Sequence, residues 1–249
     1  ELTVKDRINL IDSIGNGILK YDLPQGNWTI AVFIFKNIEW VAKAGTPYVN
    51  ILNPDVVKKF INVTHERYER RLGSDIMDQI EAIFTDEPGV PVHGCASILK
   101  EDWPIVPWAV GLDKKFLDNY GYNIYNHLEK IFFETRESYK KVRRDFWKLI
   151  SRTLEKSYFK QIGEWCQSKG INFTGHLYGE ETLSMQIGLE GELFGMLRYM
   201  QMPGVDRLYC TDPRDHIPEK TASSVAHLFG RGSVMSESSN HFEKAYWNK

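Results

Sequence analysis

The stretch "IEAIFTDEPG", residues 80–89, decides how the rest of the chain is interpreted. Its apolar run is typical of a strand buried in a parallel sheet, because such strands form short continuous apolar segments. Asp86 and Glu87 end the run, and the Pro-Gly pair that follows favours a turn. Two interpretations fit this pattern. One is an exposed strand end followed by a turn, and the other is an active-site carboxylate held at the tip of a rigid strand.

Strand-like and helix-like segments alternate along the chain on both sides of this stretch. Predicted strands cover 28–35, 80–86, 171–178, 204–210 and 232–240. Predicted helices cover 53–73, 112–132, 137–168 and 219–230, and the glycine-rich segment 181–200 is expected to be irregular to helical. This alternation predicts parallel strands joined by helical crossovers. We therefore predict one α/β domain over residues 1–249.

The residues at the strand ends distinguish between the two main α/β architectures. A doubly wound nucleotide-binding fold would have a glycine-rich turn after its first strand, and no such turn is present in the sequence. Polar and acidic residues recur at the strand ends instead, as they do in (β/α)8 barrels, where catalytic groups come from the C-terminal ends of several strands. We predict a (β/α)8 TIM barrel of the glycoside hydrolase type. Only five strands are evident, so either further strands do not stand out in the residue pattern, or the chain is an incomplete barrel excised from a longer protein.

Composition narrows the class of protein. The formal net charge of −2 lacks the basic excess expected of a nucleic-acid-binding protein. No apolar run approaches the roughly 20 residues of a membrane helix, so we expect no membrane partner. No signal peptide opens the chain, and a first residue other than Met predicts a cut or processed N-terminus, which leaves the location unassigned. Three cysteines without C-x-x-C spacing argue against a disulfide framework and a thiolate zinc site.

Two glutamates are the natural candidates for a catalytic pair. Cleavage of a glycosidic bond typically needs one carboxyl that protonates the leaving oxygen and another that acts as base or nucleophile. Glu87 and Glu237 each end an apolar strand. If the strand of Glu87 is the fourth of a barrel, the strand of Glu237 is the seventh, and the two carboxylates face one another across the barrel mouth. The alternative for each is a solvated strand end or a salt bridge.

Several further residues are candidate substrate ligands. Asp86 either replaces Glu87 in catalysis or orients it and raises its pKa through proximity of like charges. Because neighbouring residues of a strand point to opposite faces, we expect only one of these two side chains to reach the substrate. His176, Tyr178 and Glu180, within "GHLYGEE", follow the next strand, and they would bind sugar hydroxyls or serve as structural hydrogen-bonding groups.

The remaining candidates are Asp206 and two tryptophans. Asp206 lies in the predicted strand 204–210. Trp103 and Trp108 lie in a long proline-rich loop, where they would stack on a sugar or pack the loop itself. A metal-dependent hydrolase would require His176 and two carboxylates to converge within ligand distance, but the sequence has no H-E-x-x-H or EF-hand spacing.

A series of short motifs, in order, resembles glycoside hydrolase family 106, the α-L-rhamnosidase-like enzymes. The motifs are "YDLPQGNWTIAVF", "VNILNPDVVKKFI", "FTDEP", F-x-x-x-Y-G-Y-N, "VRRDFW", "SSVAHLFG" and "VMSES", between about residue 20 and residue 240. The resemblance implies a (β/α)8 catalytic domain with Glu87 and Glu237 as its acidic strand ends. It also implies an inverting hydrolase of carbohydrate metabolism, acting on a glycoside or oligosaccharide, with calcium near the substrate. The family's proteins are much longer and contain β-sandwich domains that this chain lacks.

The leading hypothesis is therefore a glycoside hydrolase that uses a pair of carboxylates, most similar to an inverting α-L-rhamnosidase. One alternative is a non-catalytic carbohydrate-binding barrel or an inactive fragment. It predicts sugar binding without turnover and two glutamates that do not face each other. The other alternative is a metal-dependent hydrolase.

Overall fold

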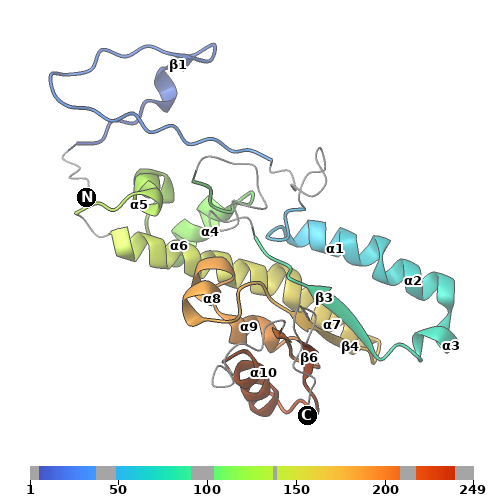
Figure 1. Cartoon of the computed structure of the whole chain (residues 1–249). Coiled ribbons are helices and arrows are strands. Elements are labelled where there is room, and N and C mark those ends of the chain that lie inside the picture. The colour runs from blue at the N-terminus through green and yellow to red at the C-terminus, as the bar shows by residue number, and fades with distance from the viewer. Residues whose placement is uncertain (1–5, 38–48, 91–103, 137–138, 208–216, 239–249) are drawn as a thin grey trace, which may run out of the picture. The chain divides into compact units, whose positions relative to one another are not determined.

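The structure is a computed structural model that describes residues 6–37, 49–90, 104–136, 139–207 and 217–238 (Figure 1). The chain divides into two compact units. One comprises Glu1–Asn37 and Asp113–Phe146, and the other comprises Ile38–Leu112 and Trp147–Lys249. The long helix α6 (Tyr139–Leu154) contributes residues to both. In the described part of the chain, none of the helices combines the length and the apolar character that a membrane span requires.

The second unit carries the strands that bear the candidate residues. Its helical elements are α1 (Pro54–Val63), α2 (His65–Leu72), α3 (Ser74–Met77), a π-helical turn η5 (Glu155–Phe159), α7 (Lys160–Ser168), α8 (Leu183–Leu189), α9 (Leu193–Leu197) and α10 (Ile217–Leu228). Its strands are β3 (Ala82–Asp86), β4 (Asn172–His176), β5 (Gly204–Arg207) and β6 (Met235–Ser238). Strand β3 pairs in parallel with β4, and β5 pairs in parallel with β6. The predicted alternation of strands and helices is confirmed here.

Glycines bring the middle strands into close contact. A Cβ at Gly175 would lie 2.0 Å from the carbonyl oxygen of Thr85, and a Cβ at Gly204 would lie 2.2 Å from that of Gly175. The backbone N–H of Met202, just before β5, donates to the carbonyl of Phe173 in β4 at 3.2 Å. The two parallel pairs therefore adjoin through β4 and β5, with their carboxyl ends at one edge. Closure into an eight-stranded barrel stays a prediction.

Helical segments pack against strands β3 and β4. Phe159 of the π-helical turn and Phe173 of β4 are fully buried, and their ring centroids lie 6.3 Å apart. The hydroxyl groups of Tyr158 and Thr85 lie 2.8 Å apart, which ties the same turn to β3. Burial of large side chains stabilises a fold by about 1.5–3 kcal/mol each, so these segments hold the strand tips on a rigid base.

Helix predictions from the sequence are confirmed. The segment 53–73 forms α1 and α2, interrupted at Thr64. The Asn53 side chain caps α1 by accepting from the Asp55 N–H at 3.0 Å, and Gly73, with φ of 77°, ends α2. In the first unit, α4 (Leu112–Tyr120) is followed by η4 (Ile124–His127) and α5 (Leu128–Phe132). The break falls at Gly121, where φ is 75°.

The strand predicted over residues 28–35 is wrong. The described residues 20–37 form no strand, and the apolar side chains of Ile30, Val32 and Ile34 are exposed. Strand conformation depends on a paired neighbour, and no described strand pairs with this segment. The first unit instead has a short hairpin of β1 (Ile14–Gly15) and β2 (Ile18–Leu19), whose turn residue Asn16 has a positive φ. η1 (Ile11–Ser13) precedes it.

Candidate active site

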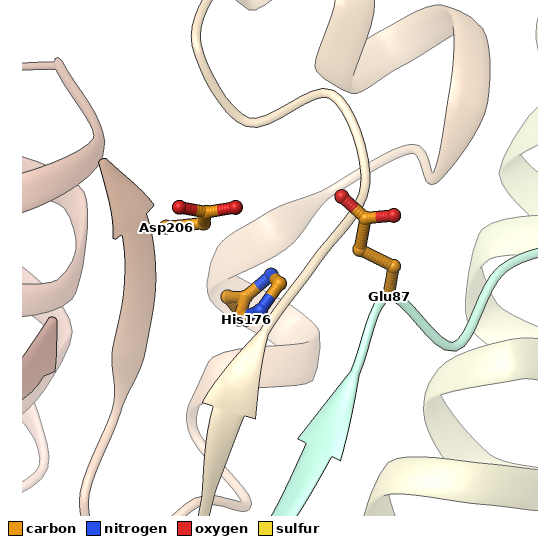
Figure 2. A group of neighbouring side chains, drawn as sticks. All are labelled: Glu87, His176 and Asp206. Atoms are coloured by element: carbon orange, nitrogen blue, oxygen red, sulfur yellow. The ribbon is translucent and has the colours of Figure 1, made fainter. Parts of the chain in front are cut away.

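Four parallel strands deliver polar side chains to the same edge. Asp86 lies opposite His176 in the β3–β4 register, and Asp206 lies opposite Glu237 in the β5–β6 register. Glu87 follows directly after β3. Figure 2 shows Glu87, His176 and Asp206 at the ends of three neighbouring strands. The sequence predicted this gathering of residues from the strand ends.

His176 is the centre of the cluster. Its side chain is 2% exposed, and its Nε2 atom lies 3.1 Å from Oε2 of Glu237 and 3.5 Å from Oδ1 of Asp86. The ring of Phe84 packs edge-on against the imidazole with 5.5 Å between centroids. Nδ1 is buried and makes no hydrogen bond to the described residues. A buried imidazole between carboxylates is well suited to orient them or to hold a proton between them.

Glu87 has a left-handed backbone, with φ of 44°. Among the described residues, Asn16 is the other non-glycine with positive φ. Such conformations are strained and persist where the surroundings over-determine them, often at functional sites. The Glu87 N–H donates to the His176 carbonyl at 3.3 Å, which anchors the strained residue to the tip of β4.

This conformation corrects the expectation that Asp86 and Glu87 point to opposite faces. Strand β3 ends at Asp86, and the alternation of side chains no longer applies at Glu87. A ligand atom of Glu87 lies within 4.8 Å of one from His176. Because Asp86 also approaches His176, both acidic residues of the opening stretch belong to the cluster.

Two carboxyls of the cluster, those of Glu87 and Asp206, have a raised pKa. Partial burial raises the pKa of Glu87, and the carboxylates of Asp86, Asp206 and Glu181 raise it further, whereas His176 opposes the shift. Burial also raises the pKa of Asp206. The Oδ1 atom of Asp206 is buried without a hydrogen-bond partner among the described residues. Ligand atoms of Glu87, His176 and Asp206 all lie within 4.8 Å of one another, so these three residues could hold a metal ion.

Glu180 lies behind this cluster and bonds to backbone groups. Its carboxyl accepts hydrogen bonds from the N–H of Leu177, at 3.3 Å, and from the N–H of Asp206. Burial outweighs these bonds and raises the pKa of Glu180 to about 8. The side chain therefore ties the loop after β4 to β5. The contact with substrate predicted for Glu180 stays a prediction.

The aromatic candidates have different outcomes. Tyr178 is half-buried in the loop after β4. Trp108 is also half-buried, and its carbonyl accepts a hydrogen bond from the Asn50 side chain at 2.9 Å. Trp103 lies outside the described residues. Sugar stacking by the tryptophans and binding by Tyr178 stay predictions.

Sequence reasoning missed Glu190. This residue caps the C-terminal end of α8, and its side chain is almost completely buried. It follows no strand and lies in a glycine-rich segment, "GLEGE", where nothing in the residue pattern indicates burial. One signal is present in the sequence, namely a glutamate at the end of a helix, where the helix dipole favours cations over carboxylates.

Comparison with solved structures finds a match to the structure of a rhamnosidase from Novosphingobium sp. PP1Y. The two share a TM-score of 0.57 and 16% sequence identity over 77% of this chain. The matched region is 17% of the rhamnosidase chain, so the present chain spans a small part of that protein. At this identity the match shows a shared fold. No protein-family model and no curated protein sequence matches the chain.

Proposed function

We propose that the chain is the catalytic part of a glycoside hydrolase, with Glu87 as general acid and Glu237 as general base. The observation that carries the proposal is the approach of both glutamates, from different strand tips, to the single imidazole of His176. The fold shared with part of a rhamnosidase supports the same reaction class. An α-L-rhamnoside, or another glycoside of a deoxy or neutral terminal sugar, is the substrate we propose first.

The two glutamates differ in ways that suit these roles. A general acid must carry a proton at the working pH, and burial together with neighbouring carboxylates raises the pKa of Glu87 in that direction. Glu237 is 33% exposed and close to His176, so it can accept a proton from water while its orientation is fixed. Asp86 and Asp206 would bind sugar hydroxyls. The inverting outcome we propose needs carboxyls about 6.5–9.5 Å apart, which leaves room for the attacking water.

Hydrolysis of a panel of aryl glycosides, including an aryl α-L-rhamnoside, tests the proposal. We expect turnover by the chain and a loss of about 10²–10⁴-fold in kcat for Glu87→Gln, because a general acid contributes that much. A loss of similar size is expected for Glu237→Gln. Product anomers followed by NMR report inversion or retention.

The matched control is Glu164→Gln, which changes a glutamate on the exposed surface of α7. It should leave turnover unchanged. If both site variants of an active chain kept most of their rate, the assignment of the pair would be wrong. Binding of the sugar without turnover would favour the non-catalytic carbohydrate-binding alternative.

A second candidate, a metal-dependent hydrolase, is favoured by the convergence of Glu87, His176 and Asp206. The buried, unpartnered Oδ1 of Asp206 is the kind of atom that a cation would satisfy. One imidazole and two carboxylates suit zinc or manganese. Calcium prefers six to eight oxygen ligands, so the calcium implied by family resemblance fits the two carboxylates and not the imidazole. A bound divalent ion would supply Lewis acidity and orient sugar hydroxyls.

The same glycoside panel separates the two candidates. Turnover that survives a chelator supports the carboxylate pair acting alone. Loss of turnover on addition of a chelator supports a metal site. Restoration by calcium would indicate a site made of the carboxylates, and restoration by zinc or manganese would indicate a site that includes the imidazole. His176→Ala should then weaken restoration by zinc more than restoration by calcium.

A further inference from the structure

Glu190 is one of two deeply buried carboxyls near the site, the other being Glu180. Glu190 is 3% exposed, and neither of its carboxyl oxygens makes a well-aligned hydrogen bond to a described residue. Its backbone is ordinary, because the N–H donates to the Gln186 carbonyl at 3.0 Å in the last turn of α8. The unusual feature is therefore the side chain alone.

The Glu190 carboxyl lies directly against the turn that carries Glu87. A Cβ at Gly89 would lie 2.9 Å from Oε1 of Glu190, so the absence of a side chain at Gly89 makes room for this oxygen. The N–H of Tyr178, in the loop after β4, interacts weakly with the carboxyl, and the carboxyls of Glu87 and Glu180 are its acidic neighbours. Glu190 thus packs beneath the turn formed by residues 87–89.

An unpartnered buried polar group destabilises the structure that contains it. An apolar side chain of the same shape would fill this space with less loss of stability. A residue that breaks such a local rule beside a proposed active site is best explained by function. The strained backbone of Glu87, two residues before Gly89, is the feature next to it that needs support.

We propose that Glu190 is a positioning residue, which supports the turn 87–89 from beneath and so holds the Glu87 carboxyl where it protonates the leaving group. This inference rests on the proposed role of Glu87 as general acid. Burial raises the pKa of Glu190 well above its ordinary value. A shift in this direction favours the protonated form of the carboxyl.

Leaving-group dependence tests the inference. Protonation of the leaving oxygen matters for a phenyl glycoside, whose leaving group is a poor one, and hardly matters for a dinitrophenyl glycoside. Glu190→Met keeps the unbranched shape and removes the carboxyl. We expect kcat/KM for the phenyl glycoside to fall about 10–100-fold and that for the dinitrophenyl glycoside less than about 3-fold, because a small misplacement of a catalytic group has this effect. Glu190→Gln should show a smaller selective loss, and Glu164→Met, on the exposed surface of α7, should show none.

A second variant approaches the same contact from the other side. Gly89→Ala places a methyl group against Oε1 of Glu190 and should give the same leaving-group-selective loss. Equal losses on both substrates, for either variant, would mean a general structural defect and would overturn the inference. Glu87→Gln serves as the reference. If it shows no leaving-group selectivity, its assignment as general acid fails. If Glu87→Gln shows the leaving-group-selective loss and neither Glu190→Met nor Gly89→Ala shows it, only the role of Glu190 fails.

Discussion

Glu180 and Glu190 are two buried glutamates next to the candidate active site, and their carboxyls differ in their hydrogen bonds. They are 2% and 3% exposed. The carboxyl of Glu180 accepts hydrogen bonds from two backbone N–H groups, one on each side of the gap between β4 and β5. The carboxyl of Glu190 makes no well-aligned hydrogen bond to a described residue and lies against the backbone of Gly89.

The difference shows that burial alone does not assign a role to a carboxyl. Glu180 joins two strands of the sheet, so removal of its acceptors should weaken the fold. The Glu190 carboxyl makes no well-aligned hydrogen bond and has only a weak interaction with the Tyr178 N–H. Its removal should therefore affect the geometry of the turn and not the stability of the sheet. Substitution of Glu180 should therefore lower the free energy of unfolding more than substitution of Glu190 does. Substitution of Glu190 should have the larger effect on leaving-group-dependent activity.

The pH dependence of stability should show the largest effect, because both residues contribute to it. The pKa of Glu180 is about 8 in the folded chain and 4.5 ordinarily, so the folded state binds a proton that the unfolded state lacks between these values. Stability from this group is complete at low pH and is lost as pH rises through about 8. We expect the free energy of unfolding, measured with urea, to fall by about 1–2 kcal/mol between pH of about 6.5 and 8 from Glu180 alone. Glu190 acts in the same direction.

The pH range of this measurement begins at about 6.5 because His65 titrates at lower pH. Burial lowers the pKa of His65, so this residue increases stability with rising pH at lower values and would mask the trend there. Glu180→Gln should flatten the curve over this range, since an amide does not titrate. A wild-type free energy that stayed constant or rose across this range would show that Glu180 is ionised in the folded chain.

Glu180→Gln should have the next largest effect, on stability at pH of about 5, where the glutamate is protonated in the folded chain. The glutamine side chain has one acceptor oxygen for the two N–H donors of Leu177 and Asp206, so its NH₂ group faces one of them. Loss of a buried hydrogen bond with an unsatisfied donor costs about 1–3 kcal/mol. The neighbouring exposed residue gives the control, and Glu181→Gln should change stability by less than about 0.5 kcal/mol. Equal effects of the two variants would contradict the role of Glu180 as a link between β4 and β5.

Residue patterns predicted the parts of this molecule that depend on local chemistry. The Asn-Pro start of α1 and the glycine end of α2 specify their elements through a cap and through backbone freedom. The apolar run of β3 predicted a strand correctly but not its burial, because Thr85 alone among its residues is buried and Phe84 is exposed. The gathering of Glu87, His176, Asp206 and Glu237 followed from one rule, that parallel strands place their carboxyl ends at the same edge.

Features that depend on contacts between distant segments could not be predicted in this way. The segment 28–35 has the composition of a strand, but no described strand pairs with it. The left-handed backbone of Glu87 arises where β3 meets β4, and it brings Asp86 and Glu87 to the same imidazole against the rule of alternation. Glu190 is buried because Gly89, about 100 residues earlier, leaves room for its carboxyl. Sequence spacing contains none of these relations.

The smallest effect is expected for Glu190→Gln, and its small size is informative. The amide has nearly the same shape as a protonated carboxyl, no well-aligned hydrogen bond is lost, and the amide oxygen can still accept from the Tyr178 N–H. We expect the free energy of unfolding, measured beside that of Glu180→Gln at the same pH, to change by less than about 0.5 kcal/mol. A loss above about 1 kcal/mol would mean that the carboxyl has a hydrogen-bond partner in the folded chain. The leaving-group-selective loss of Glu190→Met would then be open to a structural explanation. If Glu190→Gln changes stability little and Glu190→Met shows the selective loss, the explanation that fits both results is that Glu190 controls the position of the Glu87 carboxyl.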